Sequence, residues 1–87
     1  MYEITPYTLE KARAAGLVVL NSRRLHKKID VYKDGRYLAS VGQIGYKDYP
    51  TYIKENGIEY ADERRRLYHL RHTKRTWNEV LAKYLLW

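Results

Sequence analysis

Apolar and polar positions change period along the first twenty residues, which predicts a helix followed by a strand. Thr5-Pro6 is a helix start, because Thr is a favoured N-cap and Pro fits the first helical position. A short helix over 7–15 should end at Gly16, which readily adopts a left-handed conformation. The apolar run 17–20 is too short for a further helix, and it predicts a buried strand.

The next stretch has the pattern of a β-hairpin. Asp34-Gly35 is a strong signal for a two-residue turn, and the flanking segments 29–33 and 36–41 carry apolar and aromatic residues in alternation. Ile29, Val31 and Leu38 should share one face, with Tyr32 and Tyr37 in contact on the other. The predicted register pairs Lys33 with Arg36, Tyr32 with Tyr37, Val31 with Leu38, and Asp30 with Ala39.

Helical spacing returns in the second half of the chain. The segment 45–50 leads into a helix capped near Asp48 or Tyr49, and Asn56-Gly57 should end it. A second helix should begin at residue 58 or 59 and run to about residue 72.

This second helix is strongly basic. From Arg64 to Thr76 there is no acidic residue, but there are six Arg or Lys residues and two His residues. On a helical projection, one arc gathers Tyr60, Ala61, Leu67, Tyr68 and Leu70, and the opposite arc gathers Arg65, Arg66, His69 and His72. We therefore expect one side to pack on a core and the other to present a cationic ridge. Arg64 and Arg71 fall inside the apolar arc, where a guanidinium must snorkel, pair with a carboxylate or meet an anionic ligand.

The last segment reads as a C-terminal helix. Thr76 and Glu79 match the capping-box pattern, and the apolar residues from Trp77 to Leu85 follow helical spacing. We expect a single domain over residues 1–87, of the α+β class, with a small antiparallel sheet built on a β-hairpin and packed with three or four short helices.

Composition favours a binding protein with an anionic partner. The chain carries 17 basic and 10 acidic residues, a net charge of +7, and the charge is clustered. Such a balance attracts nucleic acid or an acidic protein surface. There is no cysteine for disulfides or thiolate chemistry, no apolar run long enough for a membrane span, and no pattern of a signal peptide. We expect a protein that is not secreted and has no membrane partner.

Enzymatic chemistry is not indicated. His69 and His72 have a metal-compatible spacing, but the neighbouring Arg and Lys residues would repel a cation. Ser22 and His26 lack an orienting acid and an oxyanion loop, and the glycines match no phosphate-binding motif. The expectation is a non-enzyme with no catalytic residue, no metal and no cofactor.

Two surfaces are candidates for binding. The first, for nucleic acid or another anion, combines a basic loop with the basic helix: Arg23, Arg24, Lys27, Lys28, Arg65, Arg66, His69, Arg71, His72, Lys74 and Arg75. The second, for a protein partner, is the aromatic C-terminal helix: Trp77, Tyr84, Leu85 and Trp87. The first implies a nucleic-acid-binding protein, and the second implies a small capsid or cement protein.

Three stretches carry a family resemblance: KKIDVYKDGRYLASVG (27–42), GYKDYPTY (45–52) and ADERRRLYHLRHTKR (61–75). In this order they resemble small, uncharacterised basic proteins of large double-stranded DNA viruses, which carry a "KK-x-D-V-y … G" hairpin, a "G-Y-x-D-Y/F" turn and an "RR-x-x-Y-x-x-RH" helix. The resemblance implies a viral setting, a role in the virion or with the genome, and no catalytic motif. It places the protein in the virion or the host-cell interior, with nucleic acid or a capsid protein as its partner.

Overall fold

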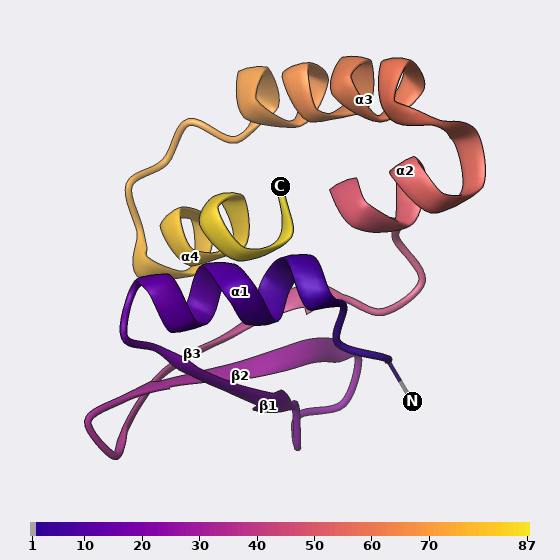
Figure 1. The fold of residues 1–87 in the computed structure, drawn as a ribbon. Coiled ribbons are helices and arrows are strands. Elements are labelled where there is room, and N and C mark those ends of the chain that lie inside the picture. The colour runs from indigo at the N-terminus through magenta and orange to yellow at the C-terminus, as the bar shows by residue number, and fades with distance from the viewer. Residues whose placement is uncertain (1) are drawn as a thin grey trace.

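A three-stranded antiparallel sheet carries helices on one face. The computed structural model describes residues 2–87, and its elements are α1 (Pro6–Ala14), β1 (Val18–Asn21), β2 (Lys27–Lys33), β3 (Arg36–Gln43), α2 (Tyr49–Asn56), α3 (Ile58–Arg71) and α4 (Trp77–Leu86). The strand order is β1-β2-β3, α1 and α4 lie on the sheet, and α3 lies outermost beside α2 (Figure 1). The α+β class expected from the sequence is confirmed.

Local capping signals set the helix starts. The side chains of Thr5, Asp48 and Thr76 accept hydrogen bonds from the backbone N–H three residues on, at 3.3, 3.2 and 3.4 Å. Gly16 and Gly57, with φ of 70° and 89°, follow α1 and α2 as expected. None of the helices in residues 2–87 is long and apolar enough to cross a membrane.

The hairpin forms with the expected turn, but its register shifts by one residue beyond Tyr32. Tyr32 pairs with Tyr37 and Lys33 with Arg36, whereas Val31 pairs with Ala39 and Asp30 with Ser40. The predicted pairs of Val31 with Leu38 and of Asp30 with Ala39 are therefore wrong, because Leu38 is the extra residue of a β-bulge. The shift places Ala39 and Val41 opposite Val31 and Ile29, so the apolar residues of both strands meet on one face.

The core lies between this sheet face and two helices. Leu81, Ala82, Leu85 and Leu86 of α4 follow helical spacing, and Ala12 of α1 completes the apolar layer. The sheet contributes Val19, Ile29, Val31, Ala39 and Val41, all buried.

A buried ion pair ties α2 to the sheet. Lys28 Nζ lies 3.0 Å from Asp48 Oδ2, and both side chains are almost fully buried. The hydroxyl of Tyr2 donates to the same oxygen at 2.6 Å, and that of Thr51 donates to Oδ1 at 2.6 Å. Every oxygen of this carboxylate therefore has a donor, which is the condition under which a buried charge is tolerated.

The basic helix is rotated from the expected orientation. Ala61 is buried and Tyr68 is half-buried, but Tyr60 and Leu70, assigned to the inner arc, are exposed by 48% and 63%. Arg64, expected inside the apolar arc, is partly buried, and so is Arg65, which was assigned to the outer ridge. The inner face contains arginines because they make cation–π contacts with tyrosines of α2. The Arg65 guanidinium lies 4.1 Å from the Tyr49 ring centroid, and the Arg64 guanidinium lies 5.6 Å from the Tyr52 ring centroid.

Candidate anion-binding groove

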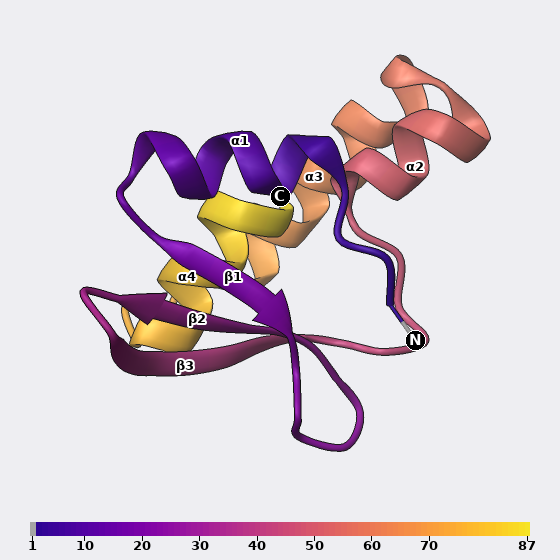
Figure 2. The same ribbon diagram turned by 60° about the horizontal axis from the view of Figure 1, so that its bottom comes forward.

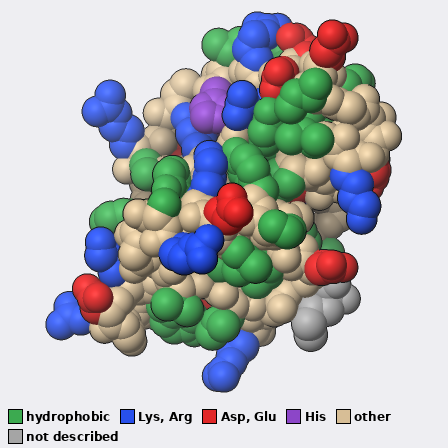
Figure 3. Space-filling model, in the orientation of Figure 1, with side chains coloured by type: hydrophobic (Ala, Val, Ile, Leu, Met, Phe, Trp, Pro, Cys, Tyr) green, Lys and Arg blue, Asp and Glu red, His purple; other side chains and the backbone are tan. Residues whose placement is uncertain are grey.

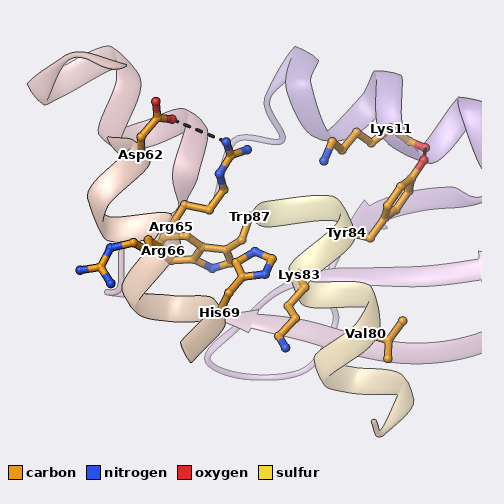
Figure 4. A pocket seen from close by; sticks show the side chains of 9 residues that line it. All are labelled: Lys11, Asp62, Arg65, Arg66, His69, Val80, Lys83, Tyr84 and Trp87. Carbon is orange, nitrogen blue, oxygen red and sulfur yellow. Dashed lines mark hydrogen bonds and ion pairs between the residues drawn. The ribbon is translucent and has the colours of Figure 1, made fainter. Parts of the chain in front are cut away.

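Three helices enclose a groove with an excess of positive charge. Its volume is about 650 Å³, and Figure 4 shows the side chains that line it. These are Lys11 of α1, Asp62, Arg65, Arg66 and His69 of α3, Val80, Lys83 and Tyr84 of α4, and the C-terminal Trp87. We call this site the cationic groove. Four Lys or Arg residues and one His line the groove with one acidic side chain, Asp62, and the Arg66 guanidinium points away from the others (Figure 4).

Helical spacing brings these side chains together. Arg65 and His69 are four residues apart and project from one side of α3, as Val80 and Tyr84 do from α4 (Figure 4). Trp87 lies between the two helices and forms the floor of the groove in this view.

Lys11 is held at the edge of the groove by tyrosines. The Tyr84 hydroxyl donates to the Lys11 carbonyl at 2.9 Å. The Lys11 ammonium lies 4.8 Å from the Tyr7 ring centroid and 5.2 Å from that of Tyr84, close enough for cation–π attraction. This arrangement restricts the lysine without neutralising it, so its charge remains available to an anion.

Two of the arginines have intramolecular partners. Arg66 makes a salt bridge of 2.5 Å with Glu63, and Arg65 makes a longer one of 3.6 Å with Asp62. The expectation of an uncompensated ridge is therefore wrong in part, because the acids that precede the acid-free run lie one helical turn from these arginines. Both pairs are solvent-exposed, and exposed pairs of this kind contribute little and are screened by salt. A polyanion can therefore compete for the two guanidinium groups.

The positive charges of the groove affect the pKa of His69. Partial burial, and then the charges of Lys83, Arg65 and Lys11, hold the pKa of His69 below its ordinary value. Cations from all three helices thus act on one side chain. A bound anion would offset these charges and favour the protonated imidazole.

Other residues of the predicted anion-binding set lie outside the groove. His72 stacks on the opposite side of Tyr68 from Trp87, and its Nδ1 faces Glu79 Oε1 at 3.4 Å. Arg71, Lys74 and Arg75 are exposed at the end of α3 and just beyond it. Across residues 2–87, no ion pair involves these last three side chains.

The basic loop is at the far end of the molecule. It connects β1 to β2, at the bottom of Figure 2, whereas α3 lies in the upper half of that view. Buried Asp30 shapes this loop by accepting hydrogen bonds from the Ser22 hydroxyl at 2.5 Å and from the Arg23 N–H at 3.1 Å. Arg23 and Arg24 are exposed, so the loop forms a second basic surface rather than part of the groove, whereas Lys27 is half-buried at the start of β2.

Two predicted contact residues are unavailable to any partner. Lys28, assigned to anion binding, is buried against Asp48, because β2 begins at Lys27 and carries Lys28 into the sheet. Leu85, assigned to a protein partner, is fully buried in the core. Of the remaining partner candidates, Trp77 is 64% exposed, Tyr84 lines the groove, and Trp87 is half-buried.

Lys11 and Lys83 are the basic groove residues that sequence reasoning missed, and Asp62 and Val80 were also outside the predicted sites. Each lysine stands alone within a helix, without basic neighbours at i±1, and only the packing of the chain brings both to the groove with α3. Figure 3, in the orientation of Figure 1, shows Lys and Arg side chains spread over this face, with several acidic side chains grouped at the top, where α3 lies, and others scattered below.

No metal-ligand cluster occurs in the part of the chain that the structure describes: no three His, Asp or Glu side chains of residues 2–87 come together. The sequence matches no model of a protein family, no curated protein and no solved structure. Function is therefore inferred from the geometry of the site.

Proposed function

We propose that this protein binds nucleic acid through the cationic groove and catalyses no reaction. The supporting observation is the convergence of Lys11, Arg65 and Lys83 from three different helices around His69. Lys and Arg groups arranged in this way suit the phosphates of a nucleic-acid backbone.

A polymer fits this surface better than a single small anion. The groove is open, and the exposed Lys74 and Arg75 extend the basic surface beyond the end of α3. These outlying charges would contact neighbouring phosphates of the same strand. They would add affinity without reading base sequence.

The salt dependence of binding tests this proposal. If Lys11, Arg65 and Lys83 each neutralise one phosphate of a duplex, they contribute a log–log slope of about −2.7. The double variant Lys11→Gln/Lys83→Gln should then reduce the slope by about 1.8 in magnitude. The matched control, Arg13→Gln/Arg36→Gln, removes the same charge from exposed positions outside the groove and should change the slope much less. Equal effects of the two double variants would contradict a role for the groove.

An acidic protein surface is the competing anion. Nuclease digests an oligonucleotide but not a folded acidic protein, so it distinguishes the two partners. If the partner is nucleic acid, protein purified at low salt should carry nucleic acid that nuclease removes. The absorbance ratio at 260 and 280 nm, before and after a high-salt wash, reports this. Protein free of nucleic acid at low salt would count against the proposal.

A virion-associated role is part of the same proposal, and its support is the resemblance of segments 27–42, 45–52 and 61–75 to basic viral proteins. A role in capsid assembly is the second candidate, and the exposed Trp77 at the start of α4 favours it. Trp77→Ala should then weaken association with a capsid protein while leaving the binding of oligonucleotides unchanged.

A further inference from the structure

A second cavity lies beside the cationic groove. Its volume is about 730 Å³, within the range of small-molecule sites. Trp87 lines both spaces, but they use different sides of α3: Arg65 and His69 face the groove, whereas Arg64 and Arg71 line the second cavity. The other walls come from the start of β2, from β3 with the segment after it, from Tyr52 of α2 and from α4.

One aromatic ring at this cavity is free to stack with a ligand. Tyr68 is enclosed between Trp87 and His72, with centroid distances of 4.3 and 4.1 Å, so both of its faces are occupied. Tyr46, in contrast, is 70% exposed at the edge of the cavity. No ring–ring contact of Tyr46 occurs within residues 2–87. A planar ligand can therefore lie against it.

Positive charge surrounds the same space. Lys27, Arg64 and Arg71 line it, and within residues 2–87 none of the three takes part in an ion pair. Lys47 also lines it but is paired with Glu55 at 2.6 Å. The free cations suit a phosphate group, because guanidinium groups bind phosphate oxygens with directed hydrogen bonds.

Glu79 supplies an acceptor. It is the only carboxylate among the lining residues. Its Oε1 faces His72, whereas Oε2 is buried and has no hydrogen-bond donor from the described residues. A buried oxygen without a donor is unfavourable. Since Oε2 has almost no accessible surface, a base N–H reaches it only when the partly exposed Glu79 side chain turns towards the cavity, and the missing donor favours that turn.

We propose that this second cavity holds one unpaired nucleotide, with its base against Tyr46, a base N–H directed to Glu79 and its phosphate on Arg64 and Arg71. The inference rests on the proposed function, because the cationic groove would carry the adjoining phosphates. It adds a preference: a base stacked in a duplex cannot enter the cavity, so single strands and frayed ends bind more tightly than duplexes.

Anisotropy titrations with a single strand and a duplex of equal length, at one salt concentration, test the preference. The wild-type protein should bind the single strand more tightly. Tyr46→Ala should weaken single-strand binding about 5-fold or more, the effect of losing one base–aromatic stack, and leave duplex binding unchanged. Trp77→Ala, which removes an exposed aromatic ring outside the cavity, is the matched control. Equal affinity for the single strand and the duplex, or a preference for the single strand that survives Tyr46→Ala, would overturn the inference.

A second measurement uses a mononucleotide in place of a polymer. In the Trp77→Phe variant, Trp87 is the only tryptophan, so its fluorescence reports on the groove and the cavity, and Arg71, which lines only the cavity, assigns the response to it. Guanosine 5′-monophosphate should change this fluorescence saturably, and Arg71→Gln should weaken the effect. Ribose 5-phosphate, which lacks the base, should have little effect; an equal response to both would contradict a nucleotide site. If the wild-type protein binds neither the single strand nor the duplex but its fluorescence still responds to guanosine 5′-monophosphate as expected, the proposed role of the groove is overturned and the nucleotide site in the cavity is not.

Discussion

The ring of Trp87 lies flat on that of Tyr68, with the centroids 4.3 Å apart and the planes 9° from parallel. Trp87 also meets Tyr52 of α2 at 6.0 Å. Leu85 and Leu86, just before it, are buried in the core. The C-terminal residue therefore joins the outer helices α2 and α3 to the body of the protein, and it contributes a wall to both proposed binding spaces.

Trp87→Ala should destabilise the protein by about 2–3 kcal/mol, less than the full cost of truncating a buried tryptophan, because the side chain is half-buried. Urea denaturation measures this change. Hydrogen exchange should show the largest loss of protection in α3, since the stacking contact of that helix is removed. Trp87→Phe retains a ring and serves as the control. Equal stability of the two variants would show that stacking does not hold α3 in place.

The buried pair of Lys28 and Asp48 should be sensitive to loss of one charge. Asp48→Asn retains a good N-cap for α2 but leaves the Lys28 ammonium buried without its counter-charge, and it should cost about 3–5 kcal/mol. The exposed pair of Lys47 and Glu55 provides the comparison, and Lys47→Gln should cause no measurable loss. Similar denaturation midpoints for the two variants would contradict the assigned role of the buried pair.

Acid should destabilise the fold through two buried carboxylates. Burial tends to raise the pKa of Asp48, but hydrogen bonds from Thr51 and Tyr2 and the charge of Lys28 outweigh burial and lower that pKa. Burial likewise tends to raise the pKa of Asp30, and hydrogen bonds from Ser22, Ser40 and Arg23 outweigh burial and lower it. A carboxyl group with a lowered folded-state pKa contributes stability above its unfolded pKa of about 3.8, and that stability is lost as pH falls towards the folded-state pKa. Denaturation at pH 6, 4 and 3 should therefore show a decline below pH 4. The decline should be shallower in Asp48→Asn.

Gly42 should tolerate substitution less well than Gly35. Both have positive φ, 79° and 78°, so alanine is strained at either position. A Cβ at Gly42 would lie 2.7 Å from a methyl carbon of Leu86 and 2.9 Å from the side chain of Lys28, whereas nothing lies within 4 Å of one at Gly35. Gly42→Ala should cost about 1–3 kcal/mol more than Gly35→Ala. Thermal unfolding of the two variants measures the difference, and equal losses would contradict close packing of β3 on α4.

Sequence reasoning succeeds here where structure is decided locally. The caps at Thr5, Asp48 and Thr76 and the turn at Asp34-Gly35 depend on a few adjacent residues, so they could be predicted. The bulge at Leu38 could not, because it is decided by which residues of β3 fit beneath the helices.

The binding site was only half predictable for the same reason. The basic run identifies α3, but the rotation of this helix about its axis depends on Tyr49 and Tyr52. Their rings contact arginines on the inner face of α3, where hydrophobic periodicity predicts apolar side chains such as leucine. Lys11 and Lys83 reach the groove from distant helices, and no local pattern links them to Arg65. Long-range packing, rather than charge clustering, completes the site.

The pKa of His69, followed by NMR with and without a nucleic-acid duplex, tests the groove most directly. Partial burial, and then the charges of Lys83, Arg65 and Lys11, lower this pKa in the free protein. Phosphates bound among these cations should offset their charges and raise it, and binding should tighten as pH falls through it. His69→Gln assigns the signal, since the chain has only two other histidines, His26 and His72. A rise in the pKa of His69 on binding is the predicted result. An unchanged pKa in a protein saturated with duplex would show that the nucleic acid lies elsewhere.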